Sequence, residues 1–357
     1  MEAWFIREWQ RNSLWQVLLR PVSWLYVSMV GLRRLLYHAG VFKSEPIGVP
    51  VIIVGNITVG GTGKTPLVLA IVALLKQHGK HCGIVTRGYQ LHPGDVSAAT
   101  VHVVRVAPGE AVVSDEATLL ARRAEVPVYA CANRVEAART LLRDRPEVDV
   151  IISDDGLQHY ALQRNIEICV IDGARGLGNN GLLPAGPLRE PASRLDAVDA
   201  IVVNRANGRG DVGSKGFFAR TPAFDMTLAN ELFMNVKTGR RMGLGDAVTS
   251  FHGKSIHALA GTGNPQRFFN HLRELGLSPG TTRAFPDHHR YVASDLQAIG
   301  AEIILMTEKD AVKCDAFADD RMWFMQVDAV LPEKFANFVL KKLTEQKADH
   351  VARPEAA

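Results

Sequence analysis

Short apolar runs alternate with segments of helical periodicity up to about residue 222. Runs of a few residues without polar interruptions are typical of strands buried on both faces of a sheet. The segments between them carry apolar residues at three- and four-residue spacing, which indicates helices. Strands that alternate with helices predict a parallel sheet wound by right-handed crossovers. The predicted strands of this part lie at residues 51–54, 82–86, 101–106, 128–130, 148–153, 166–171 and 200–204.

The pattern changes beyond residue 222. Residues 224–242 alternate like a β-hairpin or a two-stranded connector. Later strands and helices, which include a closing helix at 332–343, predict a smaller second α/β domain with a cleft between it and the first. The predicted segments are an N-terminal helical segment at 1–45, a core at 46–222, a connector and smaller domain at 223–345, and a disordered tail at 346–357.

A glycine-rich segment separates the first predicted strand from the helix that begins near Pro66. Strand, glycine-rich turn, Lys-Thr and helix is the arrangement of a P-loop. Glycines let backbone N–H groups approach phosphate oxygens, Lys64 can reach the β- and γ-phosphates, and the Thr65 hydroxyl can bind Mg²⁺. The predicted nucleotide site comprises Thr58, Val59, Gly60, Gly61, Thr62, Gly63, Lys64 and Thr65.

One position departs from the generic P-loop pattern. Thr58 stands where that pattern has its first glycine. The alternative is a glycine-rich loop that makes only a tight turn, but the flanking strand and helix favour nucleotide binding. The expected fold is therefore α/β, with a P-loop NTPase-like parallel sheet flanked by helices, a smaller second α/β domain and an N-terminal helical segment.

Two adjacent acids, Asp154 and Asp155, follow the buried run that begins at Val148. A carboxylate at the end of such a strand faces Mg²⁺ in P-loop enzymes, and ligands of parallel sheets bind beyond these strand ends. The acids are expected beside the P-loop, where Thr65, Asp154 and Asp155 form the predicted magnesium site. The pattern does not decide which of the two acids contacts the metal, and a solvated turn is the alternative for both.

Composition narrows the possible partners. The chain has 357 residues, 47% hydrophobic and 22% charged, and a formal net charge of +4. No run of lysine and arginine indicates nucleic-acid binding. The four cysteines are scattered without a C-x-x-C pair, which favours reduced thiols in a cytosolic setting and argues against structural zinc.

The first 43 residues differ from the rest, because they hold four of the five tryptophans and more basic than acidic residues. The longest uncharged stretch, 21–32, has 12 residues, whereas a membrane-spanning helix needs about 20. Aromatic residues interleaved with arginines are typical of a helix that lies in the membrane interface. The alternative is a helical pair packed on the globular body, and Pro21 is expected to break the segment into two helices.

Several motifs together resemble the tetraacyldisaccharide 4'-kinase family of lipid A biosynthesis. They follow one another in the family's order from residue 55 to about 313, and Thr58 is ordinary in this family. The motifs are Gly55–Pro66, Thr86-Arg87-Gly88-Tyr89, Asp154–His159, Pro184–Glu190, Asp287-His288 and Thr307-Glu308-Lys309-Asp310.

The resemblance implies a membrane-associated kinase on the cytoplasmic face of the bacterial inner membrane. It would use ATP and Mg²⁺ to phosphorylate the 4'-hydroxyl of a lipid, a tetraacylated glucosamine disaccharide 1-phosphate. It also implies that Asp115 and His288 form an Asp–His pair near the γ-phosphate and that Lys64 takes part in catalysis. Because His288 would come from the second domain, catalysis would require closure of the cleft. His289 is the alternative partner for Asp115.

A second class of protein shares the Gly-Gly-x-Gly-Lys-Thr core. Membrane-associated P-loop ATPase switches of the partitioning type carry an additional lysine at the position of Val59, so Val59 argues against them. The loop at 184–190 and Asp287-His288 also have no role in such a switch. The kinase is therefore the favoured interpretation.

Overall fold

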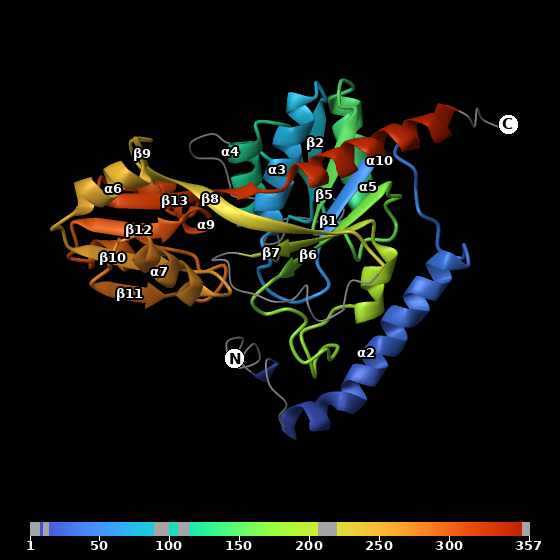
Figure 1. Ribbon diagram of the computed structural model, residues 1–357, viewed down its shortest axis with the longest axis horizontal. Helices are drawn as coiled ribbons and strands as arrows, with labels where there is room; N and C mark the ends of the chain where they lie inside the picture. Colours follow the sequence, from blue (N-terminus) through green and yellow to red (C-terminus); the bar gives the residue numbers. More distant parts are fainter. Residues whose placement is uncertain (1–7, 10–13, 89–99, 106–113, 206–219, 352–357) are drawn as a thin grey trace.

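The computed structural model describes residues 8–9, 14–88, 100–105, 114–205 and 220–351, with side chains described as far as residue 345. Thirteen strands form one continuous mixed sheet whose two halves are seen as two lobes in Figure 1. The strand order is β11-β10-β12-β13-β8-β7-β6-β1-β5-β2-β4-β3, and β9 pairs with β8 outside this path. The predicted α/β architecture is confirmed.

The first half of the sheet holds seven strands, and the short β3 is an antiparallel edge strand beside β4. Only residues 102–103 of the expected strand at 101–106 form β3, and residue 106 lies outside the described residues. The other six strands pair in parallel, as predicted. The strands are β1 (Val51–Gly55), β2 (Cys82–Thr86), β3 (His102–Val103), β4 (Val128–Ala130), β5 (Val150–Asp154), β6 (Ile166–Asp172) and β7 (Ala200–Asn204).

The second half continues the sheet through β8, the longest strand. Residues 223–226 of β8 pair in parallel with β7, and its later residues pair antiparallel with β13 and β9. The predicted two-stranded connector is thus the hairpin of β8 and β9, and β8 also joins the two halves (Figure 1). The strands are β8 (Ala223–Asn235), β9 (Arg241–Gly243), β10 (Ile256–Ala260), β11 (Thr281–Ala284), β12 (Ile303–Thr307) and β13 (Met322–Val330).

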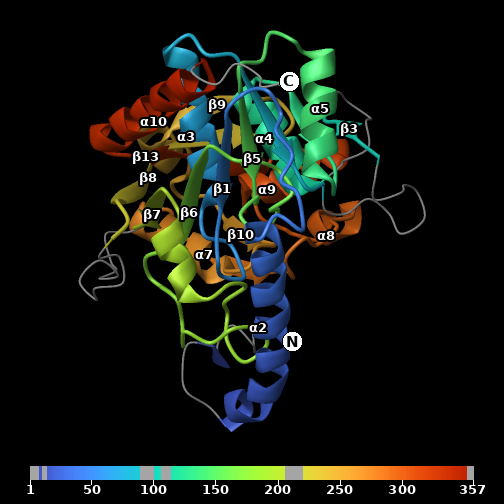
Figure 2. The same ribbon diagram turned by 90° about the vertical axis from the view of Figure 1, so that its right-hand side faces the viewer.

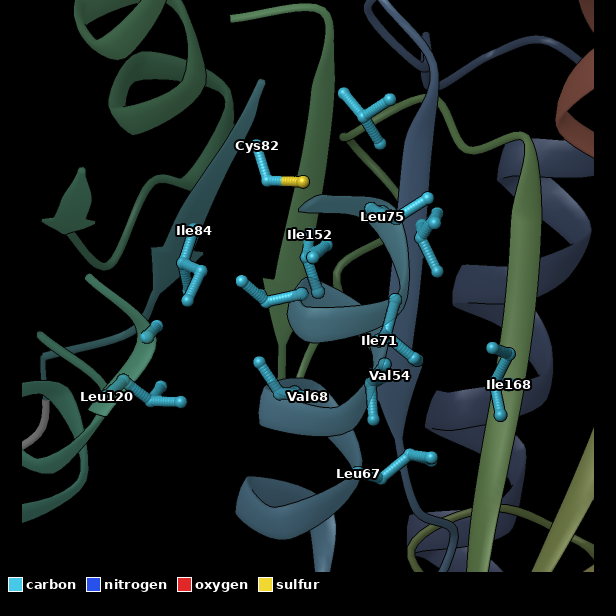
Figure 3. Packing of buried hydrophobic residues seen from close by; sticks show 14 of the residues in the cluster. Val54, Leu67, Val68, Ile71, Leu75, Cys82, Ile84, Leu120, Ile152 and Ile168 are labelled. Atoms are coloured by element: carbon cyan, nitrogen blue, oxygen red, sulfur yellow. The ribbon is translucent and has the colours of Figure 1, made fainter. Parts of the chain in front are cut away.

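Helices cover both faces of the first half. Side chains alternate along β1, so that Ile52 and Val54 pack toward α3 while Val51 and Ile53 join the cluster on the opposite face. Figure 3 shows α3 packed over the strands in the first of these clusters. The helices of this half are α3 (Lys64–Gln77), α4 (Asp115–Ala124) and α5 (Arg134–Asp144). Those of the second half are α6 (Leu244–Phe251), α7 (Pro265–Glu274), α8 (Ala293–Gln297) and α9 (Glu308–Ala311).

The C-terminal helix α10 (Glu333–Val351) packs away from its sequence neighbours. Phe335, Val339 and Leu343 belong to the same hydrophobic cluster as α3, in the first half of the molecule. The predicted second domain included this helix, whereas its buried side chains lie in the core of the first half. The helix also continues to Val351, so residues 346–351 of the expected disordered tail are helical, and residues 352–357 lie outside the described residues. The domain boundaries themselves stay predictions.

The N-terminal helix α2 (Leu14–His38) lies at the periphery of the molecule, beside the loop that follows β6 (Figure 2). It continues through Pro21, so the predicted break into two helices is wrong. A proline removes one backbone hydrogen bond, and the turns on either side keep theirs. In the part of the chain that the structure describes, no helix has the length and apolar character that a bilayer crossing requires.

Replacing Phe335 tests the packing of α10. Its ring is 2% exposed and makes an edge contact with Phe224, 5.3 Å between centroids. We expect Phe335→Ala to lower the free energy of unfolding by about 3–5 kcal/mol, as measured by urea denaturation. Lys341→Ala on the same helix, where the side chain is 78% exposed, should change it by about 0.5 kcal/mol or less. Equal effects of the two substitutions would contradict the packing of α10 into the core of the first half.

Candidate active site

The P-loop lies where β1 ends and α3 begins. Gly60 and Gly63 have φ of 98° and 96°, a region that glycine adopts without steric cost. The side-chain amide of Asn204, at the end of β7, donates a hydrogen bond to the Thr62 carbonyl (2.9 Å). A Cβ at Gly63 would collide with this amide. The loop conformation therefore depends on glycine and on the neighbouring strand end.

Lys64, the first residue of α3, is held by groups from two other strand ends. Its Nζ lies 3.2 Å from Oδ1 of Asn56 and 3.3 Å from Oδ1 of Asp155. Thr65 follows it in the first turn and is partly buried. The structure thus places Lys64 beside Asp155, which directly follows β5, as the sequence predicted, and Thr65 is the next residue of α3.

Asp154 and Asp155 have different surroundings. Asp155 adopts φ of 49°, and its carboxylate lies 3.3 Å from both Lys64 and Arg189. Burial alone would raise the pKa of Asp155, but Lys64, Arg189 and Arg134 together lower it. For Asp154, burial and the adjacent Asp155 raise the pKa to about 7. Asp155 is therefore a paired carboxylate, whereas at Asp154 burial and the adjacent Asp155 outweigh the positive charges of Lys64 and Arg134.

The orphaned oxygen of Asp154 allows a test of the predicted metal site. Among the described residues, no hydrogen-bond donor reaches Oδ1 of Asp154, and none reaches Oγ1 of Thr62. A buried carboxylate oxygen without a donor is costly unless a cation meets it. No cluster of three metal-ligating side chains occurs within the described ranges. Mg²⁺ does not require such a cluster, since it usually binds one or two carboxylates together with waters and substrate phosphates. The residues present fit the ion.

Asp115 begins α4, and Ser114 is the N-cap of this helix. Oγ of Ser114 accepts a hydrogen bond from the backbone N–H of Ala117 (3.1 Å). Asp115 itself is 2% exposed, and its Oδ2 lies 3.2 Å from Nδ1 of His288. This contact joins the first half of the molecule to the loop between β11 and α8 in the second half.

Electrostatics favour the charged forms of both partners. Burial alone would raise the pKa of Asp115, but the hydrogen bond from His288 and the lysines Lys313 and Lys309 together lower it. The same hydrogen bond raises the pKa of His288 against its partial burial. His288 also has φ of 59°, an uncommon conformation for residues other than glycine that is concentrated at functional sites.

His289 is directed elsewhere. Its Nε2 lies 3.2 Å from Oδ2 of Asp295, and its ring stacks on Phe285 with 4.5 Å between centroids. The question that the sequence left open is thereby answered, because His288 is the histidine that contacts Asp115.

The motif Thr307-Glu308-Lys309-Asp310 fixes how the second half meets α4. Thr307 caps α9 by accepting a hydrogen bond from the Asp310 N–H. Glu308 pairs with Arg123 at the end of α4 (2.8 Å), and Lys309 pairs with Glu116 at its start (2.8 Å). Acids at the N-terminus and arginines at the C-terminus also suit the dipole of α4. Ion pairs along the whole of α4 therefore set its position against α9.

A second set of contacts joins the halves at the P-loop. Nη1 of Arg267, on α7, lies 3.3 Å from Oδ2 of Asp172, and Nη2 donates to Asn204 at 3.4 Å. A Cβ at Gly263 would lie 4.0 Å from the Gly61 nitrogen and 3.6 Å from Oδ2 of Asp287. The P-loop and the Asp287-His288 motif are thus brought to one place.

The loop at 176–191 packs against the N-terminal helix. The Ser23 hydroxyl donates to the Leu182 carbonyl (3.1 Å), and the Tyr26 hydroxyl donates to the Arg189 carbonyl (2.9 Å). Glu190 is completely buried and accepts a hydrogen bond from Gln158 (2.9 Å). This loop presents Arg189 to Asp155.

Sequence reasoning missed three residues of the site, namely Asn204, Arg267 and Lys313. Asn204 carried a usable signal, because it ends a buried strand as Asp154 does. Arg267 and Lys313 carried none, since each is a basic residue on a short helix or beside one, and its partner lies far away in the sequence.

Comparisons with known proteins agree with this site. The family model described as tetraacyldisaccharide-1-P 4'-kinase matches residues 15–344. The tetraacyldisaccharide 4'-kinase of Methylobacillus flagellatus is 48% identical over 343 residues, which is 96% of each chain. That of Dechloromonas aromatica is 44% identical over 95% of this chain and 96% of its own.

A solved structure also resembles the chain. The crystal structure of the "apo" form of LpxK from Aquifex aeolicus, in complex with ATP, aligns with a TM-score of 0.76 and 28% identity. The alignment covers 92% of this chain and all of the other. By family model, relatives and fold, the chain belongs to the tetraacyldisaccharide 4'-kinase family.

Proposed function

We propose that the chain transfers the γ-phosphate of ATP to the 4'-hydroxyl of a tetraacyldisaccharide 1-phosphate, forming the 4'-phosphate of the lipid A precursor. The observation that carries this proposal is the contact between His288 and Asp115 (3.2 Å), which joins the two halves next to a P-loop. A P-loop ATPase of the partitioning type has no use for this pair. Membership of the kinase family also argues against that alternative.

Binding and orientation of the nucleotide fall to the P-loop. Its backbone N–H groups and the N-terminus of α3 favour phosphate, and Lys64 supplies a positive charge. Thr65 and Asp154 are the residues that would hold Mg²⁺, and Asp155 is already balanced by Lys64 and Arg189. Mg²⁺, when bound, neutralises charge on the β- and γ-phosphates.

Asp115 accepts the proton of the acceptor hydroxyl in this proposal. The hydroxyl oxygen forms a bond to the γ-phosphorus, the bond from that phosphorus to the β–γ bridging oxygen breaks, and ADP leaves. His288 orients the carboxylate through its hydrogen bond and keeps it ionised. Phosphoryl transfer depends on such positioning and on charge neutralisation more than on covalent chemistry.

The helix α2 supports a peripheral location on the cytoplasmic face of the inner membrane, where ATP and a lipid acceptor meet. Its polar residues Gln16 and Ser23 are buried against the protein, whereas its apolar side chains face outward. A helix that met only water would show the reverse. The exposed apolar residues of this helix are Leu14, Trp15, Val17, Leu18, Val22, Trp24, Leu25, Met29, Leu32 and Leu35.

Lys64→Ala tests the P-loop. We expect it to lower kcat/KM by about 10²–10³-fold or more, because a charge that stabilises the transferring phosphoryl group is lost. Transfer of ³²P from [γ-³²P]ATP to tetraacyldisaccharide 1-phosphate in detergent micelles is the measurement. Lys80→Ala, which removes a lysine paired with Asp149 (3.5 Å), is the control and should retain activity. Release of free phosphate alone by the unmodified protein, regardless of the lipid, would refute the kinase.

Asp115→Asn tests the proposed base. We expect kcat to fall about 10²–10⁴-fold with little change in KM for ATP, because an amide cannot accept the proton. Glu136→Gln is a matched control, since Glu136 is an acid in the first turn of another helix, α5. A large rise in KM for ATP with unchanged kcat would instead make Asp115 a nucleotide contact.

The pair Leu25→Glu and Met29→Glu tests membrane contact. These side chains are 72% and 69% exposed, and charging them should greatly reduce cosedimentation with vesicles of anionic and zwitterionic phospholipids. Val292→Glu changes an apolar side chain of 54% exposure on the other half of the molecule and should leave binding unchanged. Equal binding by all variants would rule out the interfacial role of α2.

A further inference from the structure

Lys313 is a buried lysine between two aspartates. Its side chain is 7% exposed, and Nζ lies 2.9 Å from Oδ1 of Asp310 and 3.6 Å from Oδ2 of Asp115. A buried ammonium group is expensive unless carboxylates compensate it. One of these carboxylates belongs to the second half of the molecule and the other to the first, so Lys313 links the two halves.

Asp310 anchors this lysine in the second half. The carboxylate is completely buried, and its Oδ2 accepts hydrogen bonds from the Gly261 N–H (2.9 Å) and the Thr307 hydroxyl (2.6 Å). Gly261 and Thr307 lie at the ends of the neighbouring strands β10 and β12. Asp310 is thus fixed to the sheet, and it holds the Lys313 ammonium in place toward α4.

We propose that Lys313, held by Asp310, is a positioning residue for Asp115. The inference rests on the proposed function, because it assumes that Asp115 is the base. As the two halves meet, Lys313 brings a positive charge to one side of the carboxylate while His288 donates a hydrogen bond to it. The carboxylate is thereby fixed in place, and its charge is compensated although it is buried.

Other charged groups around Asp115 are already engaged. Glu116, its neighbour on α4, pairs with Lys309 (2.8 Å), and Lys309 also pairs with Asp287 (3.1 Å). His288 is neutral or charged according to pH and lies within 4.0 Å of Glu116 and 3.9 Å of Asp287. Lys313 is therefore the lysine whose ammonium group the structure directs to Asp115.

The sign of the pH effect follows from these charges. The ammonium of Lys313 is among the groups that lower the pKa of Asp115 against burial. A carboxylate base is active at pH values above its pKa. Activity is lost as the pH falls through this pKa, because the carboxylate becomes protonated. Removing the charge raises the pKa, so activity should fail at a higher pH than in the unmodified protein.

The experiment compares Lys313→Met and Lys313→Arg in the full chain, with ATP, Mg²⁺ and the lipid acceptor in micelles. The acidic limb is the part of the pH profile in which kcat/KM falls as the pH is lowered. We expect Lys313→Met to move this limb to a higher pH by about one unit or more, since an opposite charge at this distance shifts the pKa of a carboxylate by that much. The value of kcat should fall about tenfold or more, with KM for ATP changed less than about twofold. Lys313→Arg keeps the charge and should leave the limb in place.

Lys342→Met is the matched control. It removes a lysine that pairs with Asp199 at 2.9 Å, far from Asp115 in the sequence and outside the site. Its pH profile should match that of the unmodified protein. A folded fraction that is constant over the pH range lowers all rates by the same factor and leaves the limb in place. A destabilised Lys313→Met variant therefore still gives a decision over the pH range in which its circular dichroism does not change.

The two proposals fail in different ways. An unchanged acidic limb and kcat in Lys313→Met, together with an inactive Asp115→Asn, would overturn the positioning role and leave the proposed base intact. An active Asp115→Asn would overturn the base itself. A limb that moves equally in Lys313→Met and Lys313→Arg would show that packing, and not charge, is what Lys313 contributes.

Discussion

The site depends on the compensation of one buried carboxylate. Asp115 is 2% exposed at the start of α4, where the helix dipole favours a negative charge but cannot balance it alone. The groups that compensate it, His288 and Lys313, both come from the second half. Neither half therefore contains all the charges that surround Asp115, and the architecture must bring the two halves together with a fixed register.

The sheet and the ion pairs share that task. β8 runs from the first half into the second without interruption, so the halves are joined by a strand and not by a free linker. Exposed ion pairs individually contribute little to the stability of the fold. The pair of Arg123 with Glu308 is partly buried, so removing one partner would leave a buried charge unpaired and lower the stability more. Together with the pair of Lys309 and Glu116, it specifies how α9 lies along α4.

Local patterns made most of the first half predictable. The strands at 82–86, 128–130 and 200–204 were predicted with the bounds that the structure shows, because each is an uninterrupted apolar run buried on both faces. The strand order was not predictable, since pairing is decided by long-range packing. β11 was missed because its sequence, Thr-Thr-Arg-Ala, is exposed throughout and shows no apolar alternation.

In the candidate site, too, local motifs were predictable from the sequence, whereas long-range contacts were not. The P-loop and the two acids at the end of β5, Asp154 and Asp155, are local motifs, so the sequence indicated both. The pairing of Asp115 with His288 came only from family resemblance, because the two residues are 173 positions apart. The burial of Lys313 and the contacts of Arg267 with Asp172 and Asn204 arise from tertiary packing alone. Charges in pairs of this kind leave no periodicity by which they could be recognised.

The packing of α2 connects its exposed apolar surface to the P-loop through consecutive contacts. Tyr26 on this helix donates a hydrogen bond to the carbonyl of Arg189, whose guanidinium pairs with Asp155. Asp155 in turn pairs with Lys64 of the P-loop. In the proposed function the acceptor is a membrane lipid, so the phosphate donor must be presented at a fixed distance from the lipid surface. A helix that is polar toward the active-site loop and apolar toward the outside meets this requirement, because one element determines both positions.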